Sequence, residues 1–399
     1  MPKMKLENVY KIFGPSPKQM VALLKKGQSK AQIHKNHKHS VGVNNATFSV
    51  EEGEIFVVMG LSGSGKSTLI RCLNRLIEPT SGKIFIDGED IAKATTARLR
   101  EIRRKQIAMV FQNFALLPHK TVLENVAFGL EIQKVNVEER KQKAQQILEI
   151  VGLKGYENAK PKELSGGMQQ RVGLARALAT DGDVLLMDEA FSALDPLIRK
   201  DMQDELLSLQ QKIKKTIIFI THDLDEALKI GDRIAIMKDG EIVQIGTSED
   251  ILQNPADDYV REFTQDVNRA RVITASAIMR KAESIVLERS GIRTAARKMK
   301  ELGISSIFIT DKGGVLKGIA TIDRLSTLIK ENKEDLASII DTDIQTVGLD
   351  SSIDEIIPLF LHSAYPVAVI DEENKLKGIV FKSTVLAGIA GEEEDEADA

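Results

Sequence analysis

Short apolar runs alternate with longer amphipathic stretches over the first two-thirds of the chain. Three such runs, of the kind that form buried central strands, lie at residues 55–59, 184–187 and 216–221. Alternation over residues 1–14 predicts an edge strand that ends at Gly14, and the pattern over residues 97–180 predicts mainly helices. Because strands alternate with helices, we expect a mostly parallel α/β core.

The pattern changes after about residue 265. An internal repeat with an offset of 60 residues follows, in which Ile-Phe-Ile-Thr-Asp at 307–311 matches Val-Ala-Val-Ile-Asp at 367–371. Each unit predicts the order helix, strand, turn, strand, helix. The expected division is a domain at 1–265 with a helical subdomain at about 100–180, a linker at 266–276, repeat units at 277–333 and 334–391, and an acidic tail at 392–399 that we expect to be disordered.

Residues 15–40 look like an insertion into the first domain. Two prolines precede a helical stretch, and a basic polar run follows it. Three histidines in that run, His34, His37 and His39, raise the question of a metal site. No cysteine or carboxylate of the same stretch supports such a site, so a basic surface helix is the favoured interpretation.

Composition narrows the class of partner. The net charge is −3, with 42% hydrophobic and 28% charged residues, so the chain lacks the basic excess that would indicate nucleic acid as a partner. The single cysteine, Cys72, cannot form an internal disulfide, which fits a reducing cytosol and a small buried helix residue. No segment reaches the about 18–20 consecutive apolar residues of a membrane-spanning helix. If this protein works at a membrane, it must dock on partner subunits.

The loop after the strand at 55–59 carries the strongest chemical signal. Residues 60–67 read Gly-Leu-Ser-Gly-Ser-Gly-Lys-Ser, which matches the phosphate-binding pattern GxxxxGK[ST] between a strand and a helix. The glycines let successive N–H groups point at phosphate oxygens, and the helix adds the positive end of its dipole. Lys66 can reach the β- and γ-phosphates, and Ser67 offers a hydroxyl to Mg²⁺. The expected ATP contacts here are Gly60, Ser62, Gly63, Ser64, Gly65, Lys66, Ser67 and Thr68.

Polar residues also follow the other apolar runs. Asp188 is placed to hold Mg²⁺ through water, and Glu189 is the natural base for the attacking water. His222 comes after the run at 216–221, where the ends of parallel strands face a ligand crevice, and Gln112 could sense Mg²⁺ or water. Taken singly, these residues could equally be an N-cap acid pair, a packing histidine and a surface glutamine. The candidate catalytic set is Glu189, His222, Lys66 and Gln112, and the candidate metal set is Ser67, Gln112 and Asp188.

Residues 164–170, Leu-Ser-Gly-Gly-Met-Gln-Gln, resemble the signature motif of ATP-binding-cassette (ABC) proteins. The phosphate loop, Gln112, this motif, Asp188-Glu189, Ser-Ala-Leu-Asp at 192–195 and His222 stand in the family's order. The resemblance covers about residues 3–265 and implies a P-loop ATPase fold with a helical subdomain. One position departs from the pattern, with Met168 where glutamine is more common.

The resemblance also implies a head-to-tail homodimer that holds two ATP molecules between its subunits. The residues that would face the nucleotide of the other copy, at a helix N-terminus that forms a second anion site, are Ser165, Gly166, Gly167 and Gln170. Asp195 is an expected dimer contact. Phe13 stands where the family stacks an aromatic ring on adenine, with a core phenylalanine as the alternative. The loop at 112–119 stands where importers receive a short helix of the membrane subunit.

Several stretches are similar to one subfamily, the importers of glycine betaine and other quaternary amines. They lie at 59–68, 73–80, 187–199 and 222–227. The insertion and the C-terminal repeat match as well. The resemblance implies an ATPase at the cytoplasmic face of the cell membrane, with transmembrane permease subunits and a substrate-binding domain as partners. The chain has no tryptophan and 4% aromatic residues, so it offers no cage for a quaternary ammonium ion. A different solute, such as choline or carnitine, and a non-transport ABC ATPase are the alternatives.

The C-terminal repeat resembles a tandem pair of CBS domains, which commonly bind adenine nucleotides or dimerise. The first unit has Asp323 where a ribose-binding aspartate is expected, but the second has Lys382 and Ser383, which argues against AMP or ATP. A cyclic dinucleotide between paired second units, lined by residues 364–368 with Tyr365 among them, is one alternative. A purely structural dimer module is the other.

Charge patterning in the repeat suggests a response to salt. Basic residues at near-helical spacing in the first unit are Arg293, Arg297, Lys298 and Lys300, and the tail holds six acids within 392–398. Such charges interact over about 8 Å at 0.15 M salt and over less as salt rises. We hypothesise that the basic face binds anionic lipid or the tail and restrains transport until ionic strength increases. A solvated helix face with a solubility tail is the alternative.

Overall fold

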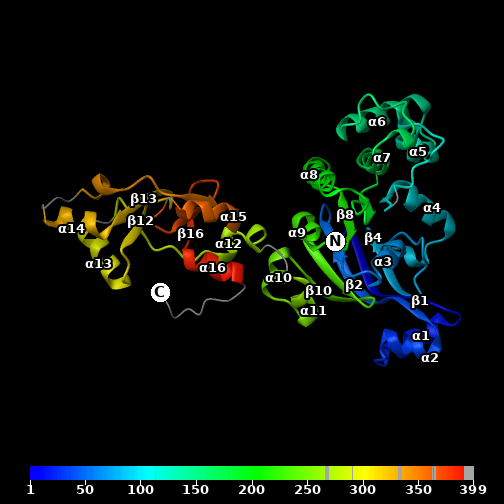
Figure 1. Ribbon diagram of the computed structural model, residues 1–399, viewed down its shortest axis with the longest axis horizontal. Coiled ribbons are helices and arrows are strands. Elements are labelled where there is room, and N and C mark those ends of the chain that lie inside the picture. The colour runs from blue at the N-terminus through cyan, green and yellow to red at the C-terminus, as the bar shows by residue number, and fades with distance from the viewer. Residues whose placement is uncertain are drawn as a thin grey trace. The chain divides into compact units, whose positions relative to one another are not determined.

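The computed structural model of the chain describes residues 1–112, 114–180, 182–265, 269–289, 291–330, 335–361, 363 and 365–390 (Figure 1). The chain divides into two compact units, Met1–Gln265 and Asp266–Ala399. The acidic tail and Ala364 lie outside the described residues. In the described part of the chain, no helix combines the length and the apolar character that crossing a membrane requires.

A six-stranded sheet with the order β10-β9-β3-β8-β7-β6 forms the core of the N-terminal unit. Its strands are β3 (Ile55–Met59), β6 (Ile107–Val110), β7 (Val184–Asp188), β8 (Thr216–Thr221), β9 (Arg233–Lys238) and β10 (Glu241–Gly246). Neighbouring strands pair in parallel except β9 and β10, which pair antiparallel. Every residue of β3, β7 and β8 is buried, as expected for central parallel strands. The prediction of a mostly parallel α/β core is therefore confirmed.

A second sheet is antiparallel and has the order β2-β1-β4-β5. Its strands are β1 (Met4–Phe13), β2 (Ser40–Val50), β4 (Ser81–Ile86) and β5 (Glu89–Asp90). The prediction of an N-terminal edge strand is wrong, because β1 pairs with β2 on one side and with β4 on the other. Alternation, with Met4 and Leu6 buried and Lys5 exposed, fixes which face of the strand turns inward but not how many neighbours it has.

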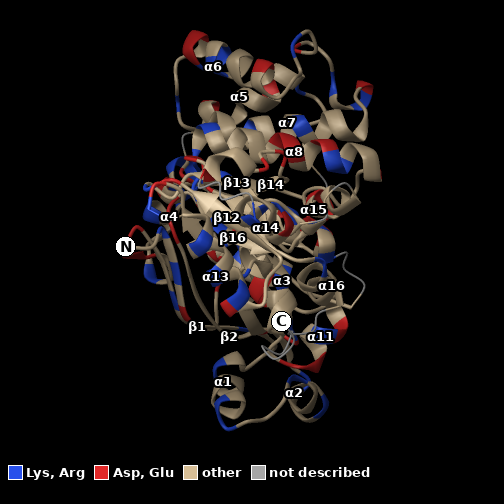
Figure 2. Cartoon of the chain, turned by 90° about the vertical axis from the view of Figure 1, so that its left-hand side faces the viewer, with Lys and Arg blue, Asp and Glu red and all other residues tan. Residues whose placement is uncertain are grey.

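Helices connect these strands. They are α1 (Pro17–Lys25), α2 (Lys30–His37), α3 (Lys66–Leu73), α4 (Thr96–Lys105), α5 (Val122–Ile132), α6 (Val137–Ile150), α7 (Gly166–Ala179), α8 (Pro196–Ile213), α9 (Leu224–Ile230), α10 (Ser248–Gln253) and α11 (Asp258–Phe263), with 3-10 turns η1 (Ile91–Lys93) and η2 (Pro161–Glu163). Figure 1 shows α5 and α6 at the far end of this unit, with α7 between them and the central sheet, which α7 contacts at β6. The insertion consists of α1 and α2, and both helices carry Lys or Arg (Figure 2).

The C-terminal unit contains two three-stranded sheets, β11-β12-β13 and β14-β15-β16. The first repeat holds β11 (Ser284–Val286), α13 (Ile292–Leu302), β12 (Ser306–Thr310), β13 (Leu316–Thr321) and α14 (Ile322–Lys330). The second holds β14 (Thr346–Gly348), α15 (Ile353–Ile356), η5 (Ile357–Leu361), β15 (Val367–Ile370), β16 (Leu376–Val380) and α16 (Lys382–Ala390). The elements η3 (Arg269–Arg271) and α12 (Ala275–Ile278) precede them, and η4 (Leu336–Ile339) lies between the repeats.

Both repeats follow the predicted order of helix, strand, turn, strand and helix, with one additional strand in front. The two turns are built alike. The Oδ1 atom of Asp311 accepts hydrogen bonds from the N–H groups of Gly313 and Val315, and that of Asp371 accepts them from Glu373 and Lys375. These Asx-type bonds close the turn that the repeated aspartate marks in the sequence.

Candidate functional site

The phosphate loop leaves β3 and enters α3 at the carboxyl edge of the central sheet. Two of its positions require glycine, because the backbone of another segment lies too close for a side chain to fit. A Cβ on Gly60 would lie 2.1 Å from the carbonyl oxygen of Met237, and one on Gly65 would lie 2.0 Å from that of Gly42. Both also have positive φ values, 148° and 108°, which side-chain-bearing residues rarely adopt. These two glycines therefore allow the loop to pack closely against both β2 and β9.

Lys66 begins α3 with its side chain turned back over the loop. Its Nζ donates to the carbonyl oxygens of Gly60, at 2.7 Å, and Leu61, at 3.1 Å. Burial lowers the pKa of Lys66, and the nearby carboxylates of Glu189 and Asp188 act in the opposite direction. A buried ammonium held by carbonyl oxygens alone lacks a full counter-charge, so the phosphates of a nucleotide would supply one.

Asp188 ends β7 and is almost fully buried, with a side chain 2% exposed. Its Oδ2 lies 3.3 Å from Nη2 of Arg71, while its Oδ1 has no hydrogen-bond partner among the described residues. The hydroxyl of Ser64, in the phosphate loop, is a second buried polar atom without a partner in the described chain. Such atoms are rare unless a ligand or ion completes their bonding.

The polar groups at this edge fit Mg²⁺. The predicted ligands, Ser67, Gln112 and Asp188, offer oxygen atoms only, which is what this cation prefers, and Oδ1 of Asp188 awaits a partner. No group of three or more His, Cys, Asp or Glu side chains gathers into a metal site in the described part of the chain. That finding does not conflict with Mg²⁺, because Mg²⁺ beside phosphates is usually bound through only one or two carboxylates.

Glu189 lies just beyond β7 and brings together side chains from three strand ends. Its Oε2 accepts a hydrogen bond of 3.0 Å from Nε2 of Gln112, which follows β6. Nδ1 of His222, which follows β8, lies 3.6 Å from the same oxygen. Glu189 has a φ of 46°, an unusual value for a residue with a side chain, and strained backbone of this kind clusters at functional sites. The three residues that the sequence separates by up to 110 positions (112 to 222) thus share one edge.

The signature motif begins α7. Ser165 is the N-cap, and its Oγ accepts a hydrogen bond of 3.3 Å from the N–H of Met168. Ser165 and Gly166 are exposed and Gly167 is partly exposed, so a ligand can reach this helix N-terminus. Gln170 differs, because it is fully buried and neither polar atom of its side chain has a partner in the described chain. Its predicted contact with nucleotide stays a prediction that the burial does not favour.

Phe13 and Asp195 are both accessible. The ring of Phe13, at the end of β1, is 42% exposed, and Nζ of Lys11 lies 4.8 Å from its centroid. An exposed ring fits the stacking alternative better than the core alternative. Asp195 is the exposed N-cap of α8, and its Oδ1 accepts a bond of 3.1 Å from the N–H of Ile198.

Sequence reasoning missed two basic residues at this edge. Arg71 pairs with Asp188, and Lys30 of the insertion contacts the phosphate loop. The position of Arg71 on α3, five residues after Lys66, was a usable signal because α3 carries the phosphate loop's lysine. No local signal marked Lys30, since its partner Gly63 lies 33 residues away.

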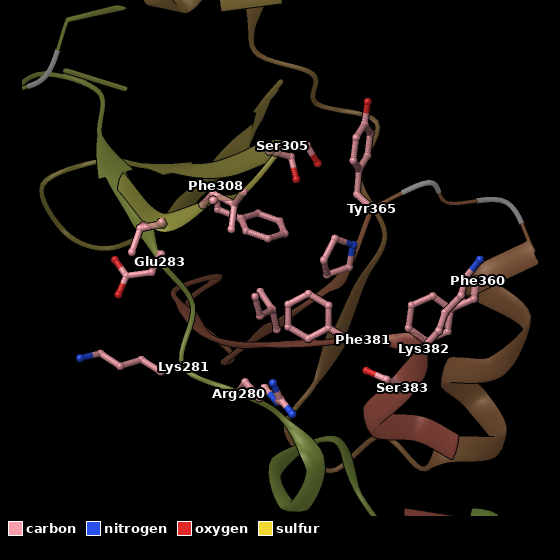
Figure 3. Close-up of a pocket in the computed structure, with 16 residues that line it drawn as sticks. Arg280, Lys281, Glu283, Ser305, Phe308, Phe360, Tyr365, Phe381, Lys382 and Ser383 are labelled. Carbon is pink, nitrogen blue, oxygen red and sulfur yellow. The ribbon is translucent and has the colours of Figure 1, made fainter. Parts of the chain in front are cut away.

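The C-terminal unit has a cavity of about 720 Å³ of its own (Figure 3). Its lining includes Phe308, Tyr365, Phe381, Arg280 and Lys382, so aromatic rings and cations meet in one place. The figure shows Phe308 and Phe381 turned toward the interior and the Tyr365 side chain near its rim.

Two expectations for the C-terminal unit can be compared with the structure. Tyr365 and Pro366 line the cavity, but Val367 and Ala368 are fully buried in β15. The expectation that those two residues line a ligand site between copies stays a prediction that their burial in the central strand of the sheet does not favour. On α13, Arg293, Arg297 and Lys300 are exposed. Lys298 instead binds Glu283, at 2.7 Å, and the carbonyl of Ser284.

Comparisons with known proteins agree with this geometry. The family model described as ABC transporter matches residues 43–192, and the one described as CBS domain matches residues 275–331 and 336–391. The chain is 54% identical over 393 residues, 98% of this chain and 99% of the relative, to the glycine betaine/carnitine transport ATP-binding protein GbuA of Listeria monocytogenes. It is 49% identical over 390 residues, 97% of each chain, to the glycine betaine/proline betaine transport system ATP-binding protein ProV of Escherichia coli.

A solved structure supports the assignment of the N-terminal unit. A bacterial ABC transporter cassette, determined as a dimer, matches 61% of this chain and 98% of its own length, with 33% identity and a TM-score of 0.53. The curated relatives extend the match over the whole chain, repeats included. The chain therefore belongs to the ATP-binding subunits of ABC transporters, in the group that carries a tandem pair of CBS domains after the ATPase cassette.

Proposed function

We propose that this chain hydrolyses ATP to power uptake of glycine betaine or a related quaternary amine through partner membrane subunits. The observation that carries the proposal is the meeting of Gln112, Glu189 and His222 beside the phosphate loop. Glu189 accepts a hydrogen bond of 3.0 Å from Gln112 and lies 3.6 Å from His222. A carboxylate fixed by the hydrogen bond from Gln112, with an imidazole beside it, is oriented to take a proton from water.

In the proposed mechanism, the N–H groups of the phosphate loop and Lys66 bind the phosphates of ATP. Bound Mg²⁺, held by Ser67, Asp188 and Gln112, would neutralise charge on the β- and γ-phosphates. Glu189 accepts the proton of the attacking water at its carboxylate, and Gln112 keeps that carboxylate turned to the site. His222, 54% exposed, contacts the γ-phosphate and orients the water.

Hydrolysis in this proposal requires two copies of the chain. The exposed N-terminus of α7, with Ser165 and Gly166, would cover the phosphates bound by the loop of the other copy. Asp195 would lie at the same interface. The arrangement is supported by the dimer found for the 33% identical cassette, a protein also solved with ADP and phosphate.

The names of the relatives support a solute of the quaternary-amine class. Their names include glycine betaine, carnitine and proline betaine, and a trimethylamine N-oxide transport ATP-binding protein of Pelagibacter ubique is 55% identical over 283 residues. We infer a quaternary amine as cargo, bound by a partner substrate-binding domain rather than by this chain. ATPase work on another solute, or outside transport, is the second candidate.

The loop at 114–119 is suited to receive a membrane subunit at the cytoplasmic face. Arg176 of α7 donates to the carbonyl oxygens of Phe114, at 2.9 Å, and Ala115, at 2.6 Å. The buried Asn125 of α5 accepts from the N–H of Leu117 at 2.7 Å. The loop is thus held by helices α5 and α7, so force applied to it would pass to the signature helix. Asn113 lies outside the described residues.

The CBS unit would regulate transport. Its cavity combines aromatic rings, among them Phe308, Phe381 and Tyr365, with cations that include Arg280 and Lys382, which suits the bases and phosphates of a cyclic dinucleotide. Alternatively, the exposed basic residues of α13 suit binding to anionic lipid, and that binding would depend on ionic strength. A purely structural dimer module is the remaining alternative.

The test is purification of the chain with its membrane partners and reconstitution into vesicles of defined lipid. We expect ATP hydrolysis coupled to uptake of labelled glycine betaine, with carnitine, choline and trimethylamine N-oxide as competitors. Hydrolysis without uptake of any quaternary amine would refute the cargo. Absence of ATP hydrolysis in the complete assembly would refute the proposal as a whole.

A further inference from the structure

The insertion formed by α1 and α2 is a small folded element with its own core. Its buried apolar residues, together with neighbours from β1 and β2, are Tyr10, Ile12, Met20, Val21, Leu24, Ile33 and Val41. His39 closes its base, because Nε2 accepts a hydrogen bond of 3.2 Å from the N–H of Ser16. Packing of this kind holds α2 in a fixed position on the N-terminal unit.

The start of helix α2 is fixed by its N-cap residue. Ser29 is the N-cap and exchanges hydrogen bonds with Gln32, in a capping box that fixes the first turn. Lys30 follows directly, although a cation in the first turn opposes the helix dipole. A residue placed against the dipole indicates that its partner lies outside the helix.

That partner is the phosphate loop. Nζ of Lys30 donates to the carbonyl oxygen of Gly63 at 3.1 Å and lies 3.6 Å from a carboxylate oxygen of Asp239. Asp239 occupies the turn between β9 and β10. The next residue, Gly240, donates its N–H to the carbonyl oxygen of Ser64 at 2.8 Å. Two successive carbonyls of the loop are therefore held by groups outside the loop.

Holding these carbonyls fixes the peptide planes, and so the shape, of the phosphate loop. The peptide unit is planar, so a carbonyl fixed on one side fixes the following N–H on the other. The carbonyl of Gly63 shares its peptide plane with the N–H of Ser64, which donates to the carbonyl oxygen of Leu61 at 3.1 Å and closes the turn of the loop. The carbonyl of Ser64 shares its plane with the N–H of Gly65. A loop whose N–H groups are ordered in advance loses less freedom when it binds a nucleotide, so it binds more tightly.

We propose that the insertion clamps the phosphate loop and that Lys30 is its positioning residue for ATP binding. The clamp has two arms, Lys30 on α2 and the Asp239–Gly240 turn, and the Lys30–Asp239 pair joins them. It raises the affinity for ATP without taking part in bond cleavage. The inference rests on the proposed ATPase function and gives the insertion, which that function does not use, a role in it.

The test compares steady-state ATP hydrolysis by the full-length chain and by Lys30→Ala, Lys30→Met and Lys30→Arg. Loss of one charge-assisted hydrogen bond is expected to raise the KM for ATP about three- to tenfold with kcat nearly unchanged. Lys30→Met keeps the aliphatic stem and should behave like Lys30→Ala, whereas Lys30→Arg should restore most of the affinity. The control is Lys35→Ala, an exposed lysine of the same helix.

A double-mutant cycle with Asp239→Asn tests the link between the two arms. If Lys30 and Asp239 act together, the double variant raises KM by less than the product of the two single-variant increases. A KM within twofold of the wild type for both Lys30→Ala and Lys30→Met would overturn the clamp. An equal effect of Lys35→Ala would do the same. Failure of the wild-type chain to hydrolyse ATP even in the complete assembly with its membrane partners would instead overturn the proposed function.

Discussion

The two units of the chain differ in whether they bury charged side chains. The N-terminal unit buries charged side chains, among them Lys66, Asp188 and Glu226, whereas the described residues of the C-terminal unit bury only two polar side chains, Thr310 and Thr384. Burying a charge is costly unless specific partners or a ligand compensate. The N-terminal unit therefore has the features of a chemical site.

The charges of the C-terminal unit lie at its surface instead. Exposed charges act through water and lose their influence as salt rises. The difference predicts in which unit the effects of substitutions should depend on salt. Substitution of buried charges in the ATPase unit should have large effects that salt hardly changes, and substitution of surface charges in the CBS unit should have smaller effects that depend on salt.

The largest expected effect tests the buried side of this comparison. Replacing Glu189 with glutamine removes the proton acceptor while keeping the shape of the side chain. We expect kcat for ATP hydrolysis to fall by about 10²–10⁴-fold, with nucleotide binding retained. Phosphate release measured at low and at high salt should show the same loss. Steady-state turnover that survives the change would contradict the role of Glu189.

The surface side is tested by neutralising Arg293, Arg297 and Lys300 together in the reconstituted transporter. Each basic residue near an anionic membrane contributes about 1 kcal/mol, so the salt concentration at which transport begins should fall. Lys298 is left in place because it binds Glu283 within the fold.

The matched control for that variant changes the same number of charges in the same unit. Arg289, Lys312 and Lys330 are also exposed, and their neutralisation should leave the threshold where it was. Equal shifts in the two triple variants would show that net charge matters and that α13 does not. No shift in either would remove the hypothesis of an electrostatic restraint.

A third prediction concerns Glu226, which the ATPase unit buries outside the candidate site. Burial raises the pKa of Glu226, although hydrogen bonds from Thr221 and Gln203 oppose the change. An acid whose pKa is raised by folding favours the folded state at low pH, and this stability is lost as pH rises past the unfolded value. Glu226→Gln should therefore stabilise the unit near pH 7.5. Each 1 kcal/mol gained in the free energy of unfolding would raise Tm by about 2–4 °C.

Thermal melts of the full chain at pH 5 and pH 7.5 measure this effect. The gain should shrink at pH 5, where the wild-type carboxyl binds its proton more readily. Glu52→Gln, at an exposed position, serves as the control. A loss of stability at pH 7.5 would mean that the buried carboxylate is fully compensated by its hydrogen-bond partners.

The smallest effect is expected at Cys72, on α3 behind the phosphate loop. Burial raises the pKa of this thiol to about 12. Because the thiolate is the reactive form, a thiol reagent at pH 8 should label the denatured chain at once and the folded chain very slowly. Labelling is followed by absorbance, with and without denaturant. Rapid labelling of the folded chain would show that α3 opens far more readily than its packing indicates.

Much of the ATPase unit could be predicted because its signals are local. A buried strand, a glycine-rich turn and a helix N-terminus occupy consecutive residues, so the phosphate loop and the strands at 55–59, 184–187 and 216–221 follow from hydrophobic pattern and backbone freedom alone. The same holds for the repeat, where matching strand and turn residues recur with an offset of 60. These features need no knowledge of what packs against them.

What the tertiary structure alone decided are contacts between residues far apart in the chain. It placed β1 inside its sheet, joined Gln112 to Glu189, gave Asp188 the partner Arg71 and brought Lys30 to Gly63. Such pairings depend on strand order and on the close packing of elements, which the periodicity of any one segment does not encode. The sequence thus determined which groups could do chemistry, and packing determined which of them meet.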